Sequence, residues 1–163
     1  MVDVSVDQMT GFGLANVLPR AGLGADAVGA ALGFTVAKGP MTSTGDGLAL
    51  WGNAPGQWLA YCDSAGPDWA DALGEKLSDT AAVVDQSSAY SLFHVTGGDA
   101  QRLLQKGLPV DLAALAHRAI VVSTIAHLGV IVQFAAPGDY KLATFRSFTN
   151  AMRHWLDASI AAL

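Results

Sequence analysis

Cysteine is almost absent from this sequence, which excludes several kinds of site and of stabilisation. Only Cys62 is a cysteine among 163 residues, so no intramolecular disulfide and no cysteine-based metal cluster can form. No secretory leader precedes Val2, and no Asn-x-Ser/Thr glycosylation site occurs. We therefore expect a reducing cytoplasm as the location, and a chain long enough to bury a hydrophobic core without cross-links.

Charged residues are also scarce. They make up 14% of the chain, against about 25% in a typical soluble domain, whereas hydrophobic residues make up 52%. An alanine-rich composition explains part of this, but the shortage of charge favours a surface that is partly buried against other proteins. The net charge of -5 argues against nucleic acid and against an anionic membrane as partners, because both repel an acidic chain.

The longest apolar stretch, residues 119–136, does not predict a membrane span. His127 and Gln133 would lie in lipid, and Gly129 interrupts the run. Most of the remaining residues are β-branched, which favours strands. We therefore expect two buried strands joined by a turn around His127 and Gly129.

The stretch from Val83 to Leu112 carries the clearest local signals. Two extended runs predict a strand pair across the polar residues 85–88. Thr96 and Asp99 have the spacing of a capping box, which predicts the start of a helix of about two turns.

The order of the expected elements indicates an α+β fold with antiparallel sheet, helices on one face and a weak ββα duplication. The glycine-rich residues 1–24 show no period, so we expect them to form an N-terminal arm before a single domain at residues 25–163. Ser147 is expected to cap the last helix. The remaining expected elements are helices at residues 26–32, 67–77 and 147–163, a hairpin at 48–61 and a strand at 140–145.

No group of side chains in the sequence predicts a catalytic centre or a metal site. The four histidines fall in separate elements without metal-ligand spacing, and there is no G-x-S-x-G motif or P-loop. Cys62 ends an apolar strand, where an inert buried thiol is expected. Asp111 either caps the turn after Pro109 or binds a ligand. Arg146 either binds a carboxylate of a partner or ligand, or is a surface arginine.

Several ordered blocks of the sequence are similar to known families. Asp85-x-Ser87, Gly97-x-Asp99-Ala100 and Asp111-Leu112 resemble the region shared by aminomethyltransferases and related folate-binding proteins. Four blocks between about Leu32 and the C-terminus more specifically resemble the gamma subunit of heterotetrameric sarcosine oxidase. Gly98 and Gln86 depart from the usual pattern, which has proline and a small apolar residue there. The four blocks are Trp51 with Pro55-Gly56-Gln57-Trp58-Leu59, Lys106-Gly107-Leu108-Pro109-Val110-Asp111-Leu112, Thr124-x-x-His127-x-Gly129-Val130, and Phe145-Arg146-Ser147-Phe148 followed by His154-Trp155-Leu156.

The resemblance implies a fold like the folate-binding domain of aminomethyltransferases and a small subunit without a cofactor of its own. In such a hetero-oligomer, partner subunits bind FAD, FMN, NAD and tetrahydrofolate. The complex oxidatively demethylates sarcosine to glycine, and the methyl carbon passes to tetrahydrofolate or leaves as formaldehyde. This chain would then assist assembly and would not be catalytic alone.

Two alternatives stay open. The first is a stand-alone folate-binding or one-carbon transfer protein, for which Asp111 and Arg146 are the residues to test, because aminomethyltransferases carry an acid near the position of Asp111. The second is a homo-oligomeric binding module that shares only the fold, since a fold does not determine a function.

Overall fold

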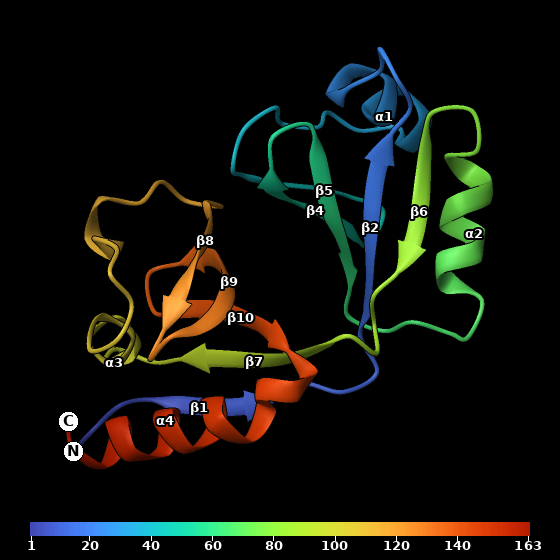
Figure 1. Cartoon of the computed structure of the whole chain (residues 1–163). Coiled ribbons are helices and arrows are strands. Elements are labelled where there is room, and N and C mark those ends of the chain that lie inside the picture. Colours follow the sequence, from blue (N-terminus) through green and yellow to red (C-terminus); the bar gives the residue numbers. More distant parts are fainter. The chain divides into compact units, whose positions relative to one another are not determined.

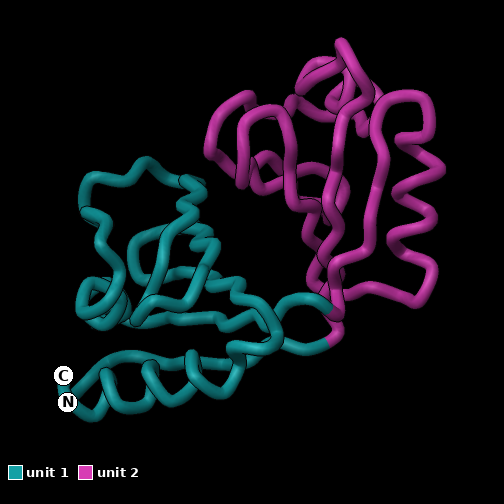
Figure 2. Tube along the Cα trace, in the orientation of Figure 1, with its two compact units in different colours: residues 1–10, 89–163 teal, residues 11–88 magenta.

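The computed structural model describes residues 1–163 and divides the chain into two compact units, shown in Figures 1 and 2. Unit 1 consists of residues 1–10 and 89–163, and unit 2 consists of residues 11–88. Each unit contains one five-stranded sheet, and each has two of the four α-helices. The expected α+β class with antiparallel sheets is confirmed.

Unit 2 has the strand order β3-β4-β5-β2-β6, with every neighbouring pair antiparallel. The expected hairpin is present as β4 and β5, and its turn is the tight pair Pro55-Gly56. Gly56 has a φ of 69°, a conformation that favours glycine. The elements of unit 2 are β2 (Gly13–Pro19), α1 (Ala25–Leu32), β3 (Thr42–Gly45), β4 (Leu48–Ala54), β5 (Gln57–Cys62), α2 (Trp69–Lys76) and β6 (Ala81–Asp85).

The two helices of unit 2 cover one face of its sheet. Val28 of α1 and Leu73 of α2 belong to the same buried cluster as Ala15, Leu50 and Ala60 of the sheet. Ala60 lies opposite both Ala15 and Leu50 in the register, and residues opposite each other point to the same face. The expectation of helices on one face is therefore confirmed for this unit.

Unit 1 has the strand order β1-β7-β10-β9-β8, again with antiparallel neighbours. Residues 119–136 form β8 and β9, as expected, and no helix of the structure is long and apolar enough to span a membrane. The elements of unit 1 are β1 (Ser5–Gln8), β7 (Tyr90–Thr96), α3 (Ala100–Gln105), the 3-10 helix η1 (Leu112–Ala114), β8 (Ile120–Ile125), β9 (Leu128–Ala136), β10 (Asp139–Phe145), the 3-10 helix η2 (Arg146–Phe148) and α4 (Thr149–Ala161).

Both helices of unit 1 also pack against one buried cluster. Leu103 of α3 and Leu156 of α4 belong to it together with Phe93, Val132 and Leu142 of the sheet. Leu142 lies opposite both Phe93 and Val132, so these three side chains share a face.

Two cationic side chains in and just after α3 donate hydrogen bonds to backbone carbonyls at the end of α4. The Lys106 Nζ donates to the carbonyl oxygens of Ser159 and Ala162, at 3.3 Å and 2.9 Å. The Arg102 guanidinium donates to the Leu163 carbonyl at 2.8 Å. The last carbonyls of a helix lack partners within the helix, so these bonds stabilise its C-terminal end.

The order of elements repeats along the chain. Strands β1 and β2, helix α1, strands β3 to β5 and helix α2 are followed by β6, β7, α3, β8 to β10 and α4. The sheet order β3-β4-β5-β2-β6 has the same form as β8-β9-β10-β7-β1. The first strand of each repeat therefore lies in the sheet of the other repeat. The expected duplication is confirmed, and the repeat is longer than the expected ββα unit.

The expectation of a loosely structured arm over residues 1–24 is not what the structure shows. Strand β1 pairs with β7, and β2 lies between β5 and β6 inside the second sheet. Leu14 and Val17 of β2 are fully buried. The glycines of this segment suggested a loop, but tertiary pairing overrides such local preferences.

The expected strand pair across residues 85–88 is wrong. The strand before this turn, β6, pairs with β2, and the strand after it, β7, pairs with β1 and β10. The Ser87 hydroxyl accepts a hydrogen bond from the Leu14 N–H at 3.0 Å, and Gln86 N–H donates to the Leu14 carbonyl at 2.7 Å. These bonds hold the turn against β2, so the chain leaves one sheet and enters the other.

Two expected helix caps are also wrong. Thr96 ends β7 and is not the N-cap of α3, which begins after Asp99. The Asp99 carboxylate accepts from the Asp3 N–H at 2.8 Å instead of reaching back to Thr96. Residue Ser147 lies inside η2, and α4 begins at Thr149 without a side-chain cap. Asp99 binds a segment 96 residues away, a contact that local spacing cannot reveal.

Candidate functional site

Asp111 lies in the loop after α3 and serves as the N-cap of η1. Its carboxylate accepts a hydrogen bond from the Ala113 N–H at 3.1 Å. This is the capping role that the sequence suggests as one of two alternatives. The side chain is exposed, so a ligand-binding role for Asp111 stays a prediction.

Arg146 begins η2 directly after β10. Its N–H donates to the Ala89 carbonyl at 2.8 Å, and its carbonyl accepts from the Thr149 hydroxyl at 2.7 Å. The backbone is therefore held on both sides, while the side chain is exposed. The three ion pairs of the structure do not include Arg146, so no salt bridge joins it to Asp111.

Aromatic residues lie close to Arg146 in the fold. Tyr90 and Phe145 lie opposite each other in the register of β7 and β10, and their rings stack with centroids 5.1 Å apart. Burial raises the pKa of the Tyr90 phenol. Phe145 is 51% exposed and Phe148 is 37% exposed. We call Tyr90, Phe145, Arg146 and Phe148 the aromatic-arginine patch.

A row of polar side chains crosses the sheet of unit 1. Asp7, His94, Lys141 and Gln133 are successive register partners on β1, β7, β10 and β9, so they point to the same face. The His94 Nε2 lies 2.8 Å from the Asp139 Oδ1. Sequence reasoning missed this grouping, because Asp7 lay in the expected arm and His94 had no partner near it in the sequence.

The His94–Asp139 pair has the contact that orients an imidazole for proton transfer. Its side chains are 33% and 41% exposed, however, and exposed ion pairs contribute little stability. The Oε1 of the neighbouring Gln133 is buried and lacks a hydrogen-bond partner. These four residues form a polar surface on which Asp139 orients His94. This agrees with the expectation that His94 is a structural or solvated histidine.

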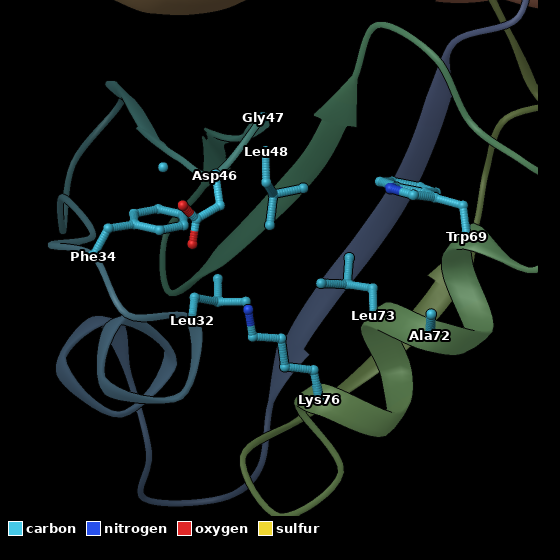
Figure 3. A pocket seen from close by; sticks show the side chains of 10 residues that line it. Leu32, Phe34, Asp46, Gly47, Leu48, Trp69, Ala72, Leu73 and Lys76 are labelled. Atoms are coloured by element: carbon cyan, nitrogen blue, oxygen red, sulfur yellow. The ribbon is translucent and has the colours of Figure 1, made fainter.

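Unit 2 contains a hollow between α2, the end of α1 and the β3–β4 turn, shown in Figure 3. Its volume is about 230 Å³, below the range of about 300–1,000 Å³ that is usual for small-molecule sites. Asp46 and Lys76 are the charged residues at its wall, and its other walls are mostly apolar. The lining residues are Leu32, Phe34, Gly45, Asp46, Gly47, Leu48, Trp69, Ala72, Leu73 and Lys76.

Cys62 is buried and free, as expected. Burial raises the pKa of its thiol, so little reactive thiolate forms near neutral pH. The neighbouring Tyr61 hydroxyl donates to the Asp63 carboxylate. No group of three or more histidine, cysteine, aspartate or glutamate residues is placed to hold a metal ion.

Comparison with solved structures identifies two similar folds. A chain of the heterotetrameric sarcosine oxidase from Corynebacterium sp. U-96 matches with a TM-score of 0.84 and 22% identity, over 98% of this chain and 84% of that chain. The aminomethyltransferase T of the glycine cleavage system from Bartonella henselae matches with a TM-score of 0.71 and 11% identity. This second match covers 95% of this chain but only 45% of the aminomethyltransferase.

At these identities the likeness establishes the fold. No protein-family model and no curated protein matches the sequence. The chain therefore has the fold shared by a chain of sarcosine oxidase and by an aminomethyltransferase, as the sequence blocks predict.

Proposed function

We propose that this chain is a non-catalytic subunit of a sarcosine-oxidase-like complex, in which it assists assembly and binds no cofactor of its own. The likeness to a chain of heterotetrameric sarcosine oxidase carries the proposal, because it spans 98% of this chain and 84% of that one. A subunit with an equivalent place in a complex is expected to match along nearly its whole length. The aminomethyltransferase, by contrast, is more than twice as long as the part that this chain matches.

The composition supports the same proposal. Charged residues make up only 14% of the chain, and two phenylalanines are exposed beside Arg146. Aromatic residues and arginine are enriched at protein interfaces, whereas most other charged residues are depleted there. The surface is therefore suited to contact with other chains.

In the proposed complex, partner subunits hold FAD, FMN, NAD and tetrahydrofolate and carry out the oxidation of sarcosine to glycine in the cytoplasm. The one-carbon unit passes to tetrahydrofolate or leaves as formaldehyde. This chain contributes protein surface to the assembly, and its single buried thiol takes no part in the chemistry.

Co-expression with the flavin-binding chains of a sarcosine-oxidase-like complex tests the proposal. We expect this chain to co-elute with flavin absorbance in size-exclusion chromatography, and sarcosine-dependent peroxide formation to fall when the chain is omitted. If the chain elutes alone and the activity is the same without it, the proposal is wrong.

A stand-alone folate-binding protein is the second candidate, favoured by the aminomethyltransferase-like fold. It predicts that the isolated chain binds tetrahydrofolate, and that Asp111→Asn or Arg146→Ala weakens the binding. The structure joins these two residues by no bond, and the Asp111 carboxylate already accepts from the backbone. Calorimetric titration of the isolated chain with tetrahydrofolate tests this candidate, and absence of binding eliminates it.

A further inference from the structure

We propose that the aromatic-arginine patch, formed by Tyr90, Phe145, Arg146 and Phe148, is the surface through which unit 1 binds its partner subunit. The structure assigns to this partner a segment in which a carboxylate is flanked by apolar side chains. The identity of the partner as a flavin-binding oxidase subunit rests on the proposed function. The location of the surface and its preference for an acidic segment rest on the residues described below.

The first argument is the exposure of two aromatic rings at one place. Phe145 and Phe148 are the only aromatic residues among the large hydrophobic side chains that are exposed, at 51% and 37%. Phe145 is the last residue of β10 and Phe148 is the last residue of η2, so both lie within two residues of Arg146 along the chain. Two exposed aromatic rings therefore flank one exposed arginine at the end of β10.

The second argument is the rigidity of the patch. The Tyr90 ring stacks against Phe145, and the Ser91 hydroxyl is hydrogen-bonded to that of Thr149 at the start of α4. The Arg146 N–H is bonded to the Ala89 carbonyl. Since these contacts already order the backbone, binding loses less conformational entropy here than on a mobile loop.

The third argument is local charge. From Leu142 to Met152 the only charged residue is Arg146, in a chain whose net charge is -5. The segment from Gln86 to Gly98, which includes Tyr90, contains no carboxylate either. Arg146 has no ion-pair partner within the chain. A planar guanidinium beside aromatic rings binds a carboxylate in a bidentate way.

The same charge argues against a second copy of this chain as the occupant. A symmetric dimer through the patch would bring the Arg146 of both copies into one interface, because a two-fold interface pairs the same surface with itself, and the patch contains no carboxylate to pair with them. Like charges in such a contact oppose association. An acidic, partly apolar segment of a different chain has the complementary chemistry.

The test uses the complete complex with the flavin-binding chains and three variants of this chain. We expect Arg146→Glu to weaken association roughly 30-fold or more, and Phe145→Ala/Phe148→Ala to weaken it comparably, as central aromatic and arginine contacts do. We also expect the association of the wild-type chain to weaken with added salt, and that of Arg146→Ala to depend less on salt.

Two control variants distinguish an effect of the patch from the effect of any charge reversal or side-chain truncation on the surface of unit 1. Arg118→Glu makes the same charge change at another exposed arginine of unit 1, and Val122→Ala shortens a side chain that is 61% exposed on β8. Both are expected to associate like the wild type. Thermal melts should place the Arg146 variants and both controls within a few degrees of the wild type, because these side chains lie at the surface. The double phenylalanine variant loses the ring stack on Tyr90, so we expect it to melt at a lower temperature but still cooperatively.

The outcomes distinguish this inference from the proposed function. If the wild-type chain does not bind the flavin-binding chains, the proposed function fails. If the wild type binds and the patch variants bind equally well, only the patch is wrong. If light scattering instead shows that the isolated wild-type chain dimerises and that Arg146→Glu abolishes the dimer, the occupant is a second copy and the inference is overturned.

Discussion

At the scale of single residues, Gly107 shows how closely unit 1 is packed. A Cβ atom placed on Gly107 would lie 2.9 Å from the Cε2 of Trp155 and 3.2 Å from the Cγ2 of Ile125. Ile125 belongs to the buried cluster, and Trp155 packs against it. Gly107, the second residue after α3, is therefore a glycine because of the space available, since its φ does not lie in the left-handed region.

We expect Gly107→Ala to lower the free energy of unfolding by about 1–3 kcal/mol, because the added methyl group overpacks this contact. Urea denaturation followed by tryptophan fluorescence measures the change. Gly129→Ala is the control, since a Cβ on Gly129 meets nothing within 4 Å and its φ is not positive. If the two substitutions lower the free energy of unfolding equally, close packing against Trp155 does not require glycine at position 107.

The titrating side chains with shifted pKa values predict loss of stability at alkaline pH. Burial raises the pKa of Cys62, Tyr61, Tyr90 and Tyr140 above their ordinary values, and the Asp63 carboxylate adds to the effect on Tyr61. Above about pH 8.5 the thiol ionises more readily in the unfolded chain than in the native protein, and the phenols follow near pH 10. Ionisation then favours the unfolded chain, so stability present at lower pH is lost as the pH rises.

We expect the free energy of unfolding to fall between pH 8 and pH 10, and to fall less steeply between pH 8 and pH 9 in Cys62→Ala. Urea denaturation at a series of pH values measures both slopes. A wild-type slope of zero, or identical slopes for the two proteins between pH 8 and pH 9, would contradict the prediction.

At the scale of elements, the sequence was most informative where the signals are local. The hydrophobic periods predicted α1, α2 and the β8–β9 pair close to their observed bounds. The partners of strands were not predictable, because β2 finds β5 and β6 at separations of more than 40 residues. The capping box of Thr96 and Asp99 was wrong for the same reason, since the partner of Asp99 is Asp3.

The contacts of the candidate site residues are likewise of two kinds, those that are local in sequence and those that depend on strand pairing. The capping role of Asp111 followed from local spacing, because its partner is two residues away. The stacking of Tyr90 on Phe145 and the contact of His94 with Asp139 depend on the pairing of β7 with β10. Sequence spacing carries no information on that register, so these groupings were found only in the structure.

The position of β1 at the edge of a sheet gives a prediction for this element. Val6 lies opposite Val95 and packs against the core of unit 1, although the sequence suggests an arm. We expect Val6→Ala to lower the free energy of unfolding by about 1–2 kcal/mol, through loss of buried methyl groups. Val122→Ala, on the opposite edge strand β8, is expected to change it by less than about 0.5 kcal/mol, because Val122 is 61% exposed. Denaturation curves with equal midpoints for both variants would show that β1 is not part of the stable fold.

At the scale of the whole molecule, the exchanged first strands determine which fragments can fold. Residues 11–88 carry all five strands of their sheet, whereas residues 89–163 carry four and lack β1. Without β1, the edge of β7 has unpaired backbone groups, and Val4 and Val6 no longer cover the core. The segment 89–163 is therefore an incomplete unit.

Joining residues 89–163 to residues 1–10 in one polypeptide would supply the missing strand β1. Asp3 bonds to Asp99 and Leu163 bonds to Arg102, so both termini lie against residues of the α3 region that are three apart in sequence. We expect residues 89–163, joined through a short glycine-serine linker to residues 1–10, to unfold cooperatively in urea, because the linker lets β1 pair with β7 as in the native chain. The same fragment without residues 1–10 is expected to lack a cooperative transition, or to aggregate through its open edge. Amide hydrogen exchange gives the decisive comparison, since protection of β7 amides only in the linked polypeptide would show that the exchanged strand completes the unit. Equal protection in both fragments would mean that four strands are enough.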